Sequence, residues 1–175
     1  SIKLSDESNL VSNENTIIGN TVLYGATSGK LFAAGQAGDR CAVRNSGATT
    51  VIEGCDSNGC EYMTGGTVVI LGDVGDNFAA GMTGGMAFIF DKSREFEKKV
   101  NPDSVIWQNV ETDYWISYLK ELILEHSKET GSLISKDIFD NFKNEIKNFV
   151  QVCPKEMINK LKNPITLKST IKEVS

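Results

Sequence analysis

Four short apolar runs recur at nearly even intervals in the first half of the chain. They span residues 30–34, 49–53, 67–71 and 86–90. Each run has the length of a β-strand, and most are rich in the β-branched and aromatic residues that favour strands. When the runs are superimposed by their period, one column contains Ala33, Ile52, Ile70 and Ile89. The pattern predicts four strands that lie side by side in a parallel sheet.

Both faces of these predicted strands are largely apolar. The face of the Ala33 column also carries Leu31, Thr50, Val68 and Ala87. The opposite face carries Phe32, Val51, Val69 and Phe88. One face must line an interior, and the other would be exposed to water unless the C-terminal helices or a larger protein cover it. We therefore treat Phe32, Val51, Val69 and Phe88 as a candidate interface.

Glycine recurs in the same region with a period of 18 or 19 residues. One series is Gly29, Gly47, Gly66 and Gly84, and a second is Gly35, Gly54 and Gly72. A fixed period of this length is typical of solenoids, and tight corners favour glycine. The predicted fold is mainly β, a parallel β-helix of about four coils followed by C-terminal α-helices. We expect a right-handed coil, because parallel crossovers are nearly always right-handed.

A second series of positions follows the same period between the predicted strands. It contains Val22, Cys41, Cys60 and Phe78. Because these residues are apolar and fall in register, we expect a second strand in each coil.

The C-terminal region has a helical period. Thr112 can cap a helix with one apolar face, and Gly131 is suited to end it. Ser132 or Ser135 can begin a second helix with Ile138, Phe142, Ile146 and Phe149 on one face. Residues 149–153 fit an extended segment, and Pro154 suits the start of a last short helix over 155–161.

These patterns divide the chain into five parts. We expect a flexible N-terminal segment at 1–14, the glycine-rich β-helix at 15–91, a linker at 92–111, a helical extension at 112–162 and a loose tail at 163–175.

The chain has 175 residues and a net charge of −5, which argues against a nucleic-acid or anionic-membrane surface. No apolar run approaches the ~20 residues of a membrane span. The polar start lacks both a signal peptide and an initial Met, so we expect a processed piece or a fragment.

The residues suggest no catalytic, cofactor-binding or metal site. The glycine-rich loops lack the order of a nucleotide-binding motif. Without a secretory signal, Cys41, Cys55, Cys60 and Cys153 are expected to be reduced, buried thiols in a reducing intracellular compartment. We expect His126 to be a solvated helix residue without a carboxylate partner. Asp39, Asp76 and Asp91 are expected to form turns. Arg40 and Arg44 are the only arginines of the predicted solenoid. The polar corner of Arg44, Asn45, Ser46 and Gly47 either binds a partner or only satisfies the turn, and we favour the turn.

Three long segments resemble a known family. They are GDRCAVRNSGATTVIEG at 38–54, GCEYMTGGTVVILG at 59–72 and NFAAGMTGGMAFIFD at 77–91. These segments, together with IIGNTVLYGATSGKLFAAG at 17–35, resemble the GXGXG domain of the glutamate synthase large (alpha) subunit, a right-handed β-helix. HSKETGSLISKDIFDNF and NFVQVCP resemble the helical tail of that family. The resemblance covers nearly the whole chain.

The resemblance implies a non-catalytic, structural role in nitrogen metabolism. The family converts glutamine, 2-oxoglutarate and two electrons into two glutamates, in ammonia assimilation and glutamate biosynthesis. Its glutaminase domain, FMN-binding synthase domain and 3Fe–4S cluster lie outside these residues, as does its use of NAD(P)H or ferredoxin. The chain alone is therefore expected to be no enzyme, although its parent is an oxidoreductase. The expected partners are the other domains of the large subunit, with a small (beta) subunit as a further candidate, in the cytoplasm or a plastid.

Two alternatives remain open. One is a standalone β-helix subunit, as in some archaeal glutamate synthases and in a subunit of formylmethanofuran dehydrogenase. The other is a module that binds a small ligand at its glycine corners. Neither nucleic acid nor membrane is an expected partner.

Overall fold

A computed structural model describes residues 1–166 of the chain. Its sheet has seven strands in the order β1-β2-β3-β4-β5-β7-β6. They are β1 (Thr16–Ile18), β2 (Lys30–Ala37), β3 (Ser46–Cys55), β4 (Thr64–Ile70), β5 (Gly84–Phe90), β6 (Val105–Asn109) and β7 (Phe149–Pro154). The first five are parallel, and β7 pairs antiparallel with both β5 and β6. The predicted column of Ala33, Ile52, Ile70 and Ile89 is confirmed by the register.

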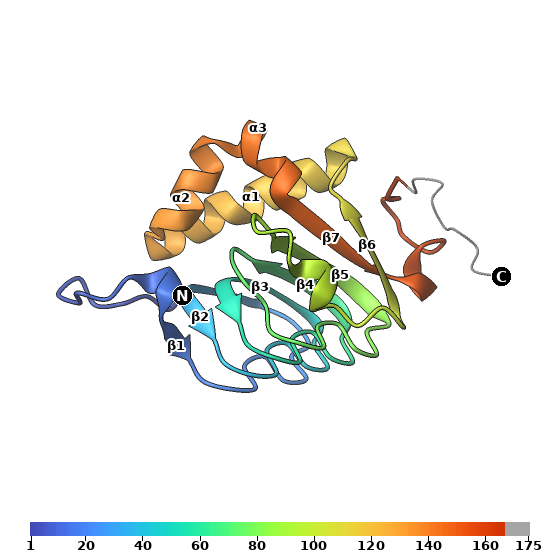
Figure 1. The fold of residues 1–175 in the computed structure, drawn as a ribbon, viewed down its shortest axis with the longest axis horizontal. Coiled ribbons are helices and arrows are strands. Elements are labelled where there is room, and N and C mark those ends of the chain that lie inside the picture. The colour runs from blue at the N-terminus through green and yellow to red at the C-terminus, as the bar shows by residue number, and fades with distance from the viewer. Residues whose placement is uncertain (167–175) are drawn as a thin grey trace.

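The strands form the upper side of a β-solenoid, and the loops between them stack along its lower edge in Figure 1. The predicted second strand in each coil is wrong, because these loops are turns. Every second residue in them has a left-handed φ of 54° to 65°. These residues fall in three columns: Thr21, Arg40, Asn58 and Asn77; Leu23, Ala42, Cys60 and Ala79; Gly25, Arg44, Tyr62 and Gly81. We call these three columns the turn ladder.

Hydrogen bonds between coils hold the turn ladder in register. The N–H groups of Arg44 and Tyr62 donate to Glu61 O and Ala80 O on the following coils, at 3.0 and 2.8 Å. The N–H of Cys60 donates to Cys41 O on the preceding coil, at 2.8 Å. The period predicted from the apolar positions is therefore right. The period could not reveal the backbone conformation, since stacked turns and stacked strands repeat alike.

Two apolar clusters lie on opposite faces of the sheet. The solenoid core lies inside the coil and includes Ala33, Cys41, Ile52, Cys60, Val68, Ile70, Phe78, Ile89, Val150 and Val152. The helix-side core lies between the sheet and the helices and includes Phe32, Val51, Val69, Phe88, Trp115, Leu119, Ile123, Ile138, Phe149 and Cys153. Strand β7 contributes side chains to both cores, so it connects them.

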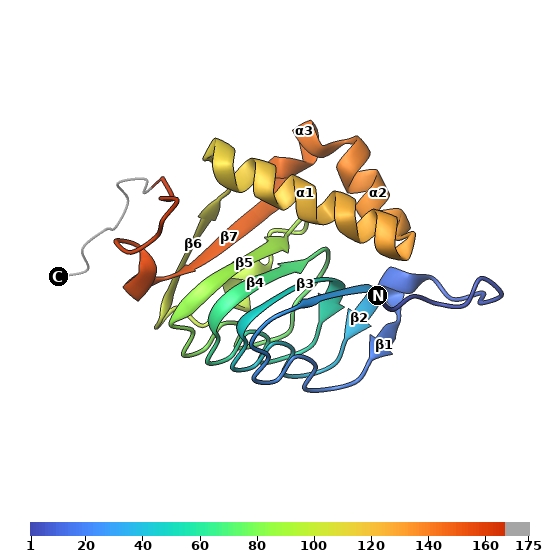
Figure 2. The ribbon, with the colours of Figure 1, turned by 180° about the vertical axis from the view of Figure 1, so that it is seen from behind.

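The helices are α1 (Asp113–Thr130), α2 (Leu133–Asp140) and α3 (Phe142–Glu145). They lie over the outer face of the sheet, as Figure 2 shows from behind. Thr112 and Ser132 are the N-cap residues of α1 and α2, and Gly131 ends α1 with a left-handed φ of 69°. The predicted second helix is interrupted at Asn141. Single 3₁₀ turns follow at Ile146–Asn148 and Lys155–Met157, so the last predicted helix is one turn long.

Segments expected to be irregular also make ordered contacts. The segment 92–111, expected to be a linker, contains β6 and a 3₁₀ turn at Phe96–Lys98. Near the N-terminus, Ile2 pairs with Ala33 and its N–H donates to Phe32 O at 2.7 Å. Of the expected loose tail, residues 167–175 lie outside the described residues. Ile165 is buried, and Trp115 Nε1 donates to Asn163 O at 3.1 Å.

Candidate functional site

The candidate interface predicted on the outer sheet face lies under the chain's own helices. Phe32, Val51, Val69 and Phe88 are each at most 5% exposed. The Phe88 ring contacts Trp115 of α1 with centroids 6.0 Å apart. Of the two covers considered for this face, the structure therefore provides the C-terminal helices. These four side chains are not available to another domain while α1 is in place.

The predicted structural glycines lie in the strands or beside them. They are Gly29, Gly35, Gly47, Gly54, Gly66, Gly72 and Gly84. Coil stacking explains Gly84, where a Cβ would lie 2.0 Å from the carbonyl oxygen of Thr64 on the neighbouring coil. Gly66 has a left-handed φ of 83° and equally little room. At both residues the neighbouring coil comes too close for a side chain.

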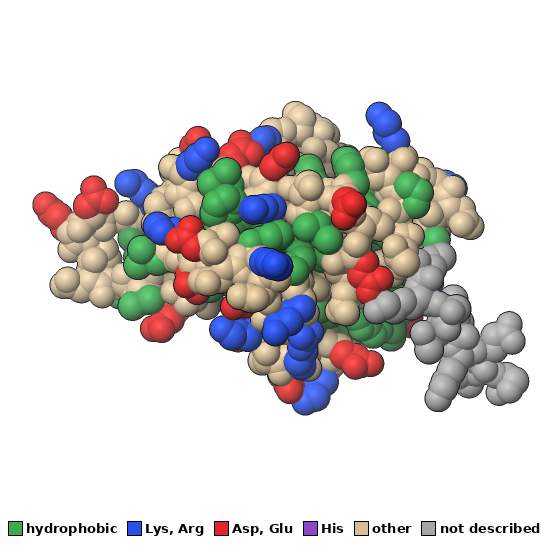
Figure 3. Space-filling view, turned by 90° about the horizontal axis from the view of Figure 1, so that it is seen from above, with side chains coloured by type: hydrophobic (Ala, Val, Ile, Leu, Met, Phe, Trp, Pro, Cys, Tyr) green, Lys and Arg blue, Asp and Glu red, His purple; other side chains and the backbone are tan. Residues whose placement is uncertain are grey.

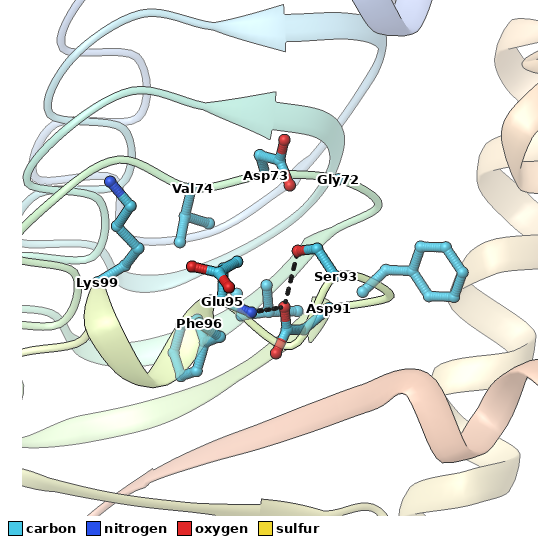
Figure 4. A pocket seen from close by; sticks show the side chains of 10 residues that line it. Gly72, Asp73, Val74, Asp91, Ser93, Glu95, Phe96 and Lys99 are labelled. Atoms are coloured by element: carbon cyan, nitrogen blue, oxygen red, sulfur yellow. Dashed lines mark hydrogen bonds between the residues drawn. The ribbon is translucent and has the colours of Figure 1, made fainter.

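A hollow of about 390 Å³ lies beside the ends of β4 and β5 (Figure 4). Asp91 anchors its wall by accepting hydrogen bonds from the Glu95 N–H at 2.9 Å and from Ser93 Oγ at 3.4 Å. Asp73 and Lys99 also line the hollow. Lys99 Nζ donates to Asp76 Oδ1 at 2.7 Å, and this hydrogen bond raises the pKa of Lys99.

The hollow is acidic but lacks a recognisable reactive group. The predicted turn-forming role holds for Asp91, and for Asp39, whose Oδ1 accepts the Ser57 N–H at 3.1 Å. Asp76 instead forms the ion pair with Lys99. Within residues 1–166, no three His, Cys, Asp or Glu side chains are grouped to hold a metal ion.

A buried polar cluster connects the solenoid to the helices. Glu53 of β3 accepts a hydrogen bond from Ser132 Oγ, and Ser132 Oγ also accepts the Ser135 N–H at 3.2 Å as the N-cap of α2. His126 Nε2 lies 3.9 Å from Glu53 Oε1. Side chains of both Glu53 and His126 are fully buried. We call Glu53, His126 and Ser132 the interlayer cluster.

The expectation of a solvated His126 is therefore wrong. His126 is 0% exposed and packs against the Phe32 ring with centroids 6.0 Å apart. The helical period contained the signal, because Leu119, Leu122 and Ile123 precede His126 at spacings of seven, four and three residues, all on one face of α1. The contact between His126 and Glu53 could not be predicted from the sequence, because the two residues are 73 positions apart in the chain.

The interlayer cluster contains the residue types of a nucleophilic triad in an arrangement that cannot work as one. Ser132 donates to Glu53 rather than to His126, so no base is positioned to take its proton. At 3.9 Å, the His126–Glu53 contact exceeds hydrogen-bond length. All three residues are buried. The hydrogen bond from Ser132 to Glu53 connects the start of α2 to β3.

The four cysteines are free and buried, as predicted. Burial raises the pKa of Cys41 to about 12 and that of Cys153 to about 11. Burial also raises the pKa values of Cys55 and Cys60 well above the ordinary value. Because the thiolate is the nucleophile, these thiols are inert packing groups at neutral pH.

The architecture belongs to the class of β-solenoids with a helical cover on one side of the coil. A sequence model described as the GXGXG motif matches residues 1–155, and the chain belongs to this family. None of the helices in residues 1–166 has the length and apolar character needed to cross a membrane.

Several proteins with a similar segment are named glutamate synthases. The chain is 58% identical over 170 residues to the glutamate synthase [NADPH] large chain of Azospirillum brasilense, covering 97% of this chain and 11% of the relative. It is 44% identical to the corresponding large chain of Bacillus subtilis (strain 168), covering 88% and 10%. It is 47% identical to ferredoxin-dependent glutamate synthase 2 of Synechocystis sp., covering 81% and 9%. The chain thus spans about a tenth of the length of these relatives.

Proposed function

We propose that this chain is a structural domain of a glutamate synthase large chain and contributes no reacting group. The observation that carries the proposal is the burial of all four thiols and of the single imidazole. The reaction of the parent, from glutamine, 2-oxoglutarate and reductant to two glutamates, would then take place in other domains. This domain would hold those domains in position.

The names of the relatives support a role that is independent of the electron donor. Similar segments occur in relatives named for NADPH, NADH and ferredoxin, at 44% to 58% identity. A domain that selected the donor would be expected to differ among these proteins. We propose that FMN, the 3Fe–4S cluster and the site for NAD(P)H or ferredoxin all lie outside this chain.

The proposed partners are the other domains of the large chain, with a small (beta) subunit as a second candidate. The free thiols favour a reducing compartment, the cytoplasm or a plastid, because a thiol persists where disulfides are kept reduced.

The proposal can be tested with a substitution that unfolds this domain within the full-length large chain. Val69→Asp places a charge between β4 and α1, at a position with 0% exposure. We expect Val69→Asp to lower glutamate formation from glutamine at least tenfold, while glutamine hydrolysis and ammonia-dependent glutamate formation each stay within threefold of wild type. Val69→Ala is the matched control and should retain glutamate formation from glutamine.

A catalytic role would give a different result, because one of the two partial reactions would be lost. A bracing role would be excluded if Val69→Asp unfolds the domain, as shown by proteolysis, and glutamine-dependent synthesis stays at the wild-type rate.

A further inference from the structure

The turn ladder is the long side of the solenoid that the helices leave uncovered (Figures 1 and 2). Figure 3 shows the opposite side, where the helices present charges of both signs. Tyr62 of the turn ladder is 53% exposed, and Tyr24, which lies between the ladder residues Leu23 and Gly25, is 51% exposed. Arg44 is exposed on the coil between them. We call Tyr24, Arg44 and Tyr62 the tyrosine–arginine ridge.

The ridge is built into the backbone of the turn ladder. Arg44 and Tyr62 occupy the same column on successive coils, and both have the left-handed φ that such side chains rarely adopt. The Tyr62 ring lies over Gly81 of the next coil, where a Cβ would come within 2.5 Å of the ring. The glycine therefore makes room for the ring, and the ring has a defined position without a partner.

The ridge carries a positive charge in the acidic half of the chain. Residues 1–91 contain 4 Lys and Arg and 10 Asp and Glu, a net charge of 4 − 10 = −6. Arg40 and Arg44 are the two arginines in this part of the chain. Within residues 1–166, no hydrogen bond or ion pair engages the Arg44 guanidinium. Tyrosine and arginine are among the residue types that dominate binding energy in protein interfaces.

We propose that the tyrosine–arginine ridge is the surface on which another domain of the same large chain docks. That domain would present a carboxylate to Arg44 and apolar surface to the two tyrosine rings. The inference rests on the proposed function. It is supported by the chain's share of its relatives, since about nine-tenths of their length lies outside the matched segment. The proposed partner would lie in that remainder.

Tyrosine acetylation by N-acetylimidazole, read residue by residue by mass spectrometry, tests the proposal directly. In the 175-residue chain, Tyr24 and Tyr62 should react about as fast as Tyr114, which is 47% exposed on α1. In the full-length large chain, Tyr24 and Tyr62 should react at least tenfold more slowly than in the 175-residue chain. If Tyr62 reacts equally fast in both proteins, the ridge is free and the proposal is overturned.

The double variant Arg44→Asn and Tyr62→Asn tests the consequence of docking. Asparagine tolerates the left-handed conformation, so the melting temperature of the 175-residue chain should stay within about 3 °C of wild type. In the full-length large chain, glutamine-dependent synthesis should fall at least fivefold while both partial reactions persist. Arg40→Asn, on the same ladder but outside the ridge, is the matched control and should have no effect.

The outcomes separate the two proposals. If the double variant behaves like wild type while Val69→Asp uncouples the partial reactions, the ridge proposal fails and the structural role stands. If neither variant uncouples them, the structural role fails as well. A concentration-dependent dimer of the 175-residue chain that the double variant abolishes would assign the ridge to a second copy and overturn the domain partner.

Discussion

Ser132 joins two stabilising interactions in one hydroxyl. It caps α2 through the Ser135 N–H and donates to the buried carboxylate of Glu53. Ser132→Ala should remove a cap of about 1 kcal/mol and leave Glu53 without this donor, at a cost of about 1–3 kcal/mol. We expect the free energy of unfolding, measured in urea, to fall by roughly 2–4 kcal/mol in total.

Ser132→Thr is the control, because threonine keeps a hydroxyl that can cap and donate. A loss below about 0.5 kcal/mol for Ser132→Ala would mean that Glu53 is satisfied without the serine, since that is less than an N-cap alone contributes.

Because of the buried thiols, we expect the stability of the protein to fall at alkaline pH. Burial raises the pKa of Cys41 from 9.0 to about 12, so the native state keeps a proton that the unfolded state loses above pH 9. The contribution of Cys41 is therefore fully present below pH 9 and is lost as the pH rises toward 12. Between these two pH values, the free energy of unfolding should fall by about 1.4 kcal/mol per pH unit because of this thiol.

Other groups titrate in the same range, so the wild type is compared with Cys41→Ala. The difference between their free energies of unfolding should be constant from pH 7 to 8.5. Above pH 9, the free energy of unfolding of the wild type should fall relative to that of the variant. A difference that stays constant to pH 11 would show that the Cys41 thiol ionises in the native state.

At the scale of elements, the structure explains which predictions succeeded. The strands were predictable because one apolar column repeats in every coil and pairs residue for residue, as Ala33 does with Ile52. The turn ladder could not be predicted in this way, because residue types such as Leu23 and Cys60 do not indicate a left-handed φ. The contact of His126 with Glu53 depends on the packing of α1 on β3, which local patterns do not encode.

Two glycines separate the effect of backbone conformation from that of space. At Gly131 a Cβ would meet nothing within 4 Å, so Gly131→Ala should cost about 1 kcal/mol through its left-handed φ alone. At Gly84 the Cβ would lie 2.0 Å from the Thr64 carbonyl oxygen, which belongs to rigid backbone. Gly84→Ala should therefore cost about 3 kcal/mol or more in urea unfolding. Equal costs at the two sites would contradict the claim that close coil contact requires glycine.

At the scale of the whole molecule, one sheet separates the two cores and connects them. In β7, Val150 and Val152 pack into the solenoid core, while Phe149 and Cys153 pack into the helix-side core. The interlayer cluster adds a polar connection from β3 to the helices. The helices therefore cannot leave the sheet without exposing the faces that hold β3 and β7, and we infer that both layers unfold together.

The two tryptophans report on the two cores separately. Trp107 packs against the solenoid core, and Trp115 lies in the helix-side core. The variants Trp107→Phe and Trp115→Phe each retain one fluorescent reporter. If the layers unfold together, the urea midpoint seen by fluorescence should equal the midpoint seen by far-ultraviolet circular dichroism within each variant. An earlier fluorescence transition of Trp115 in Trp107→Phe would instead show that the helices detach first and that the solenoid is stable without its helical cover.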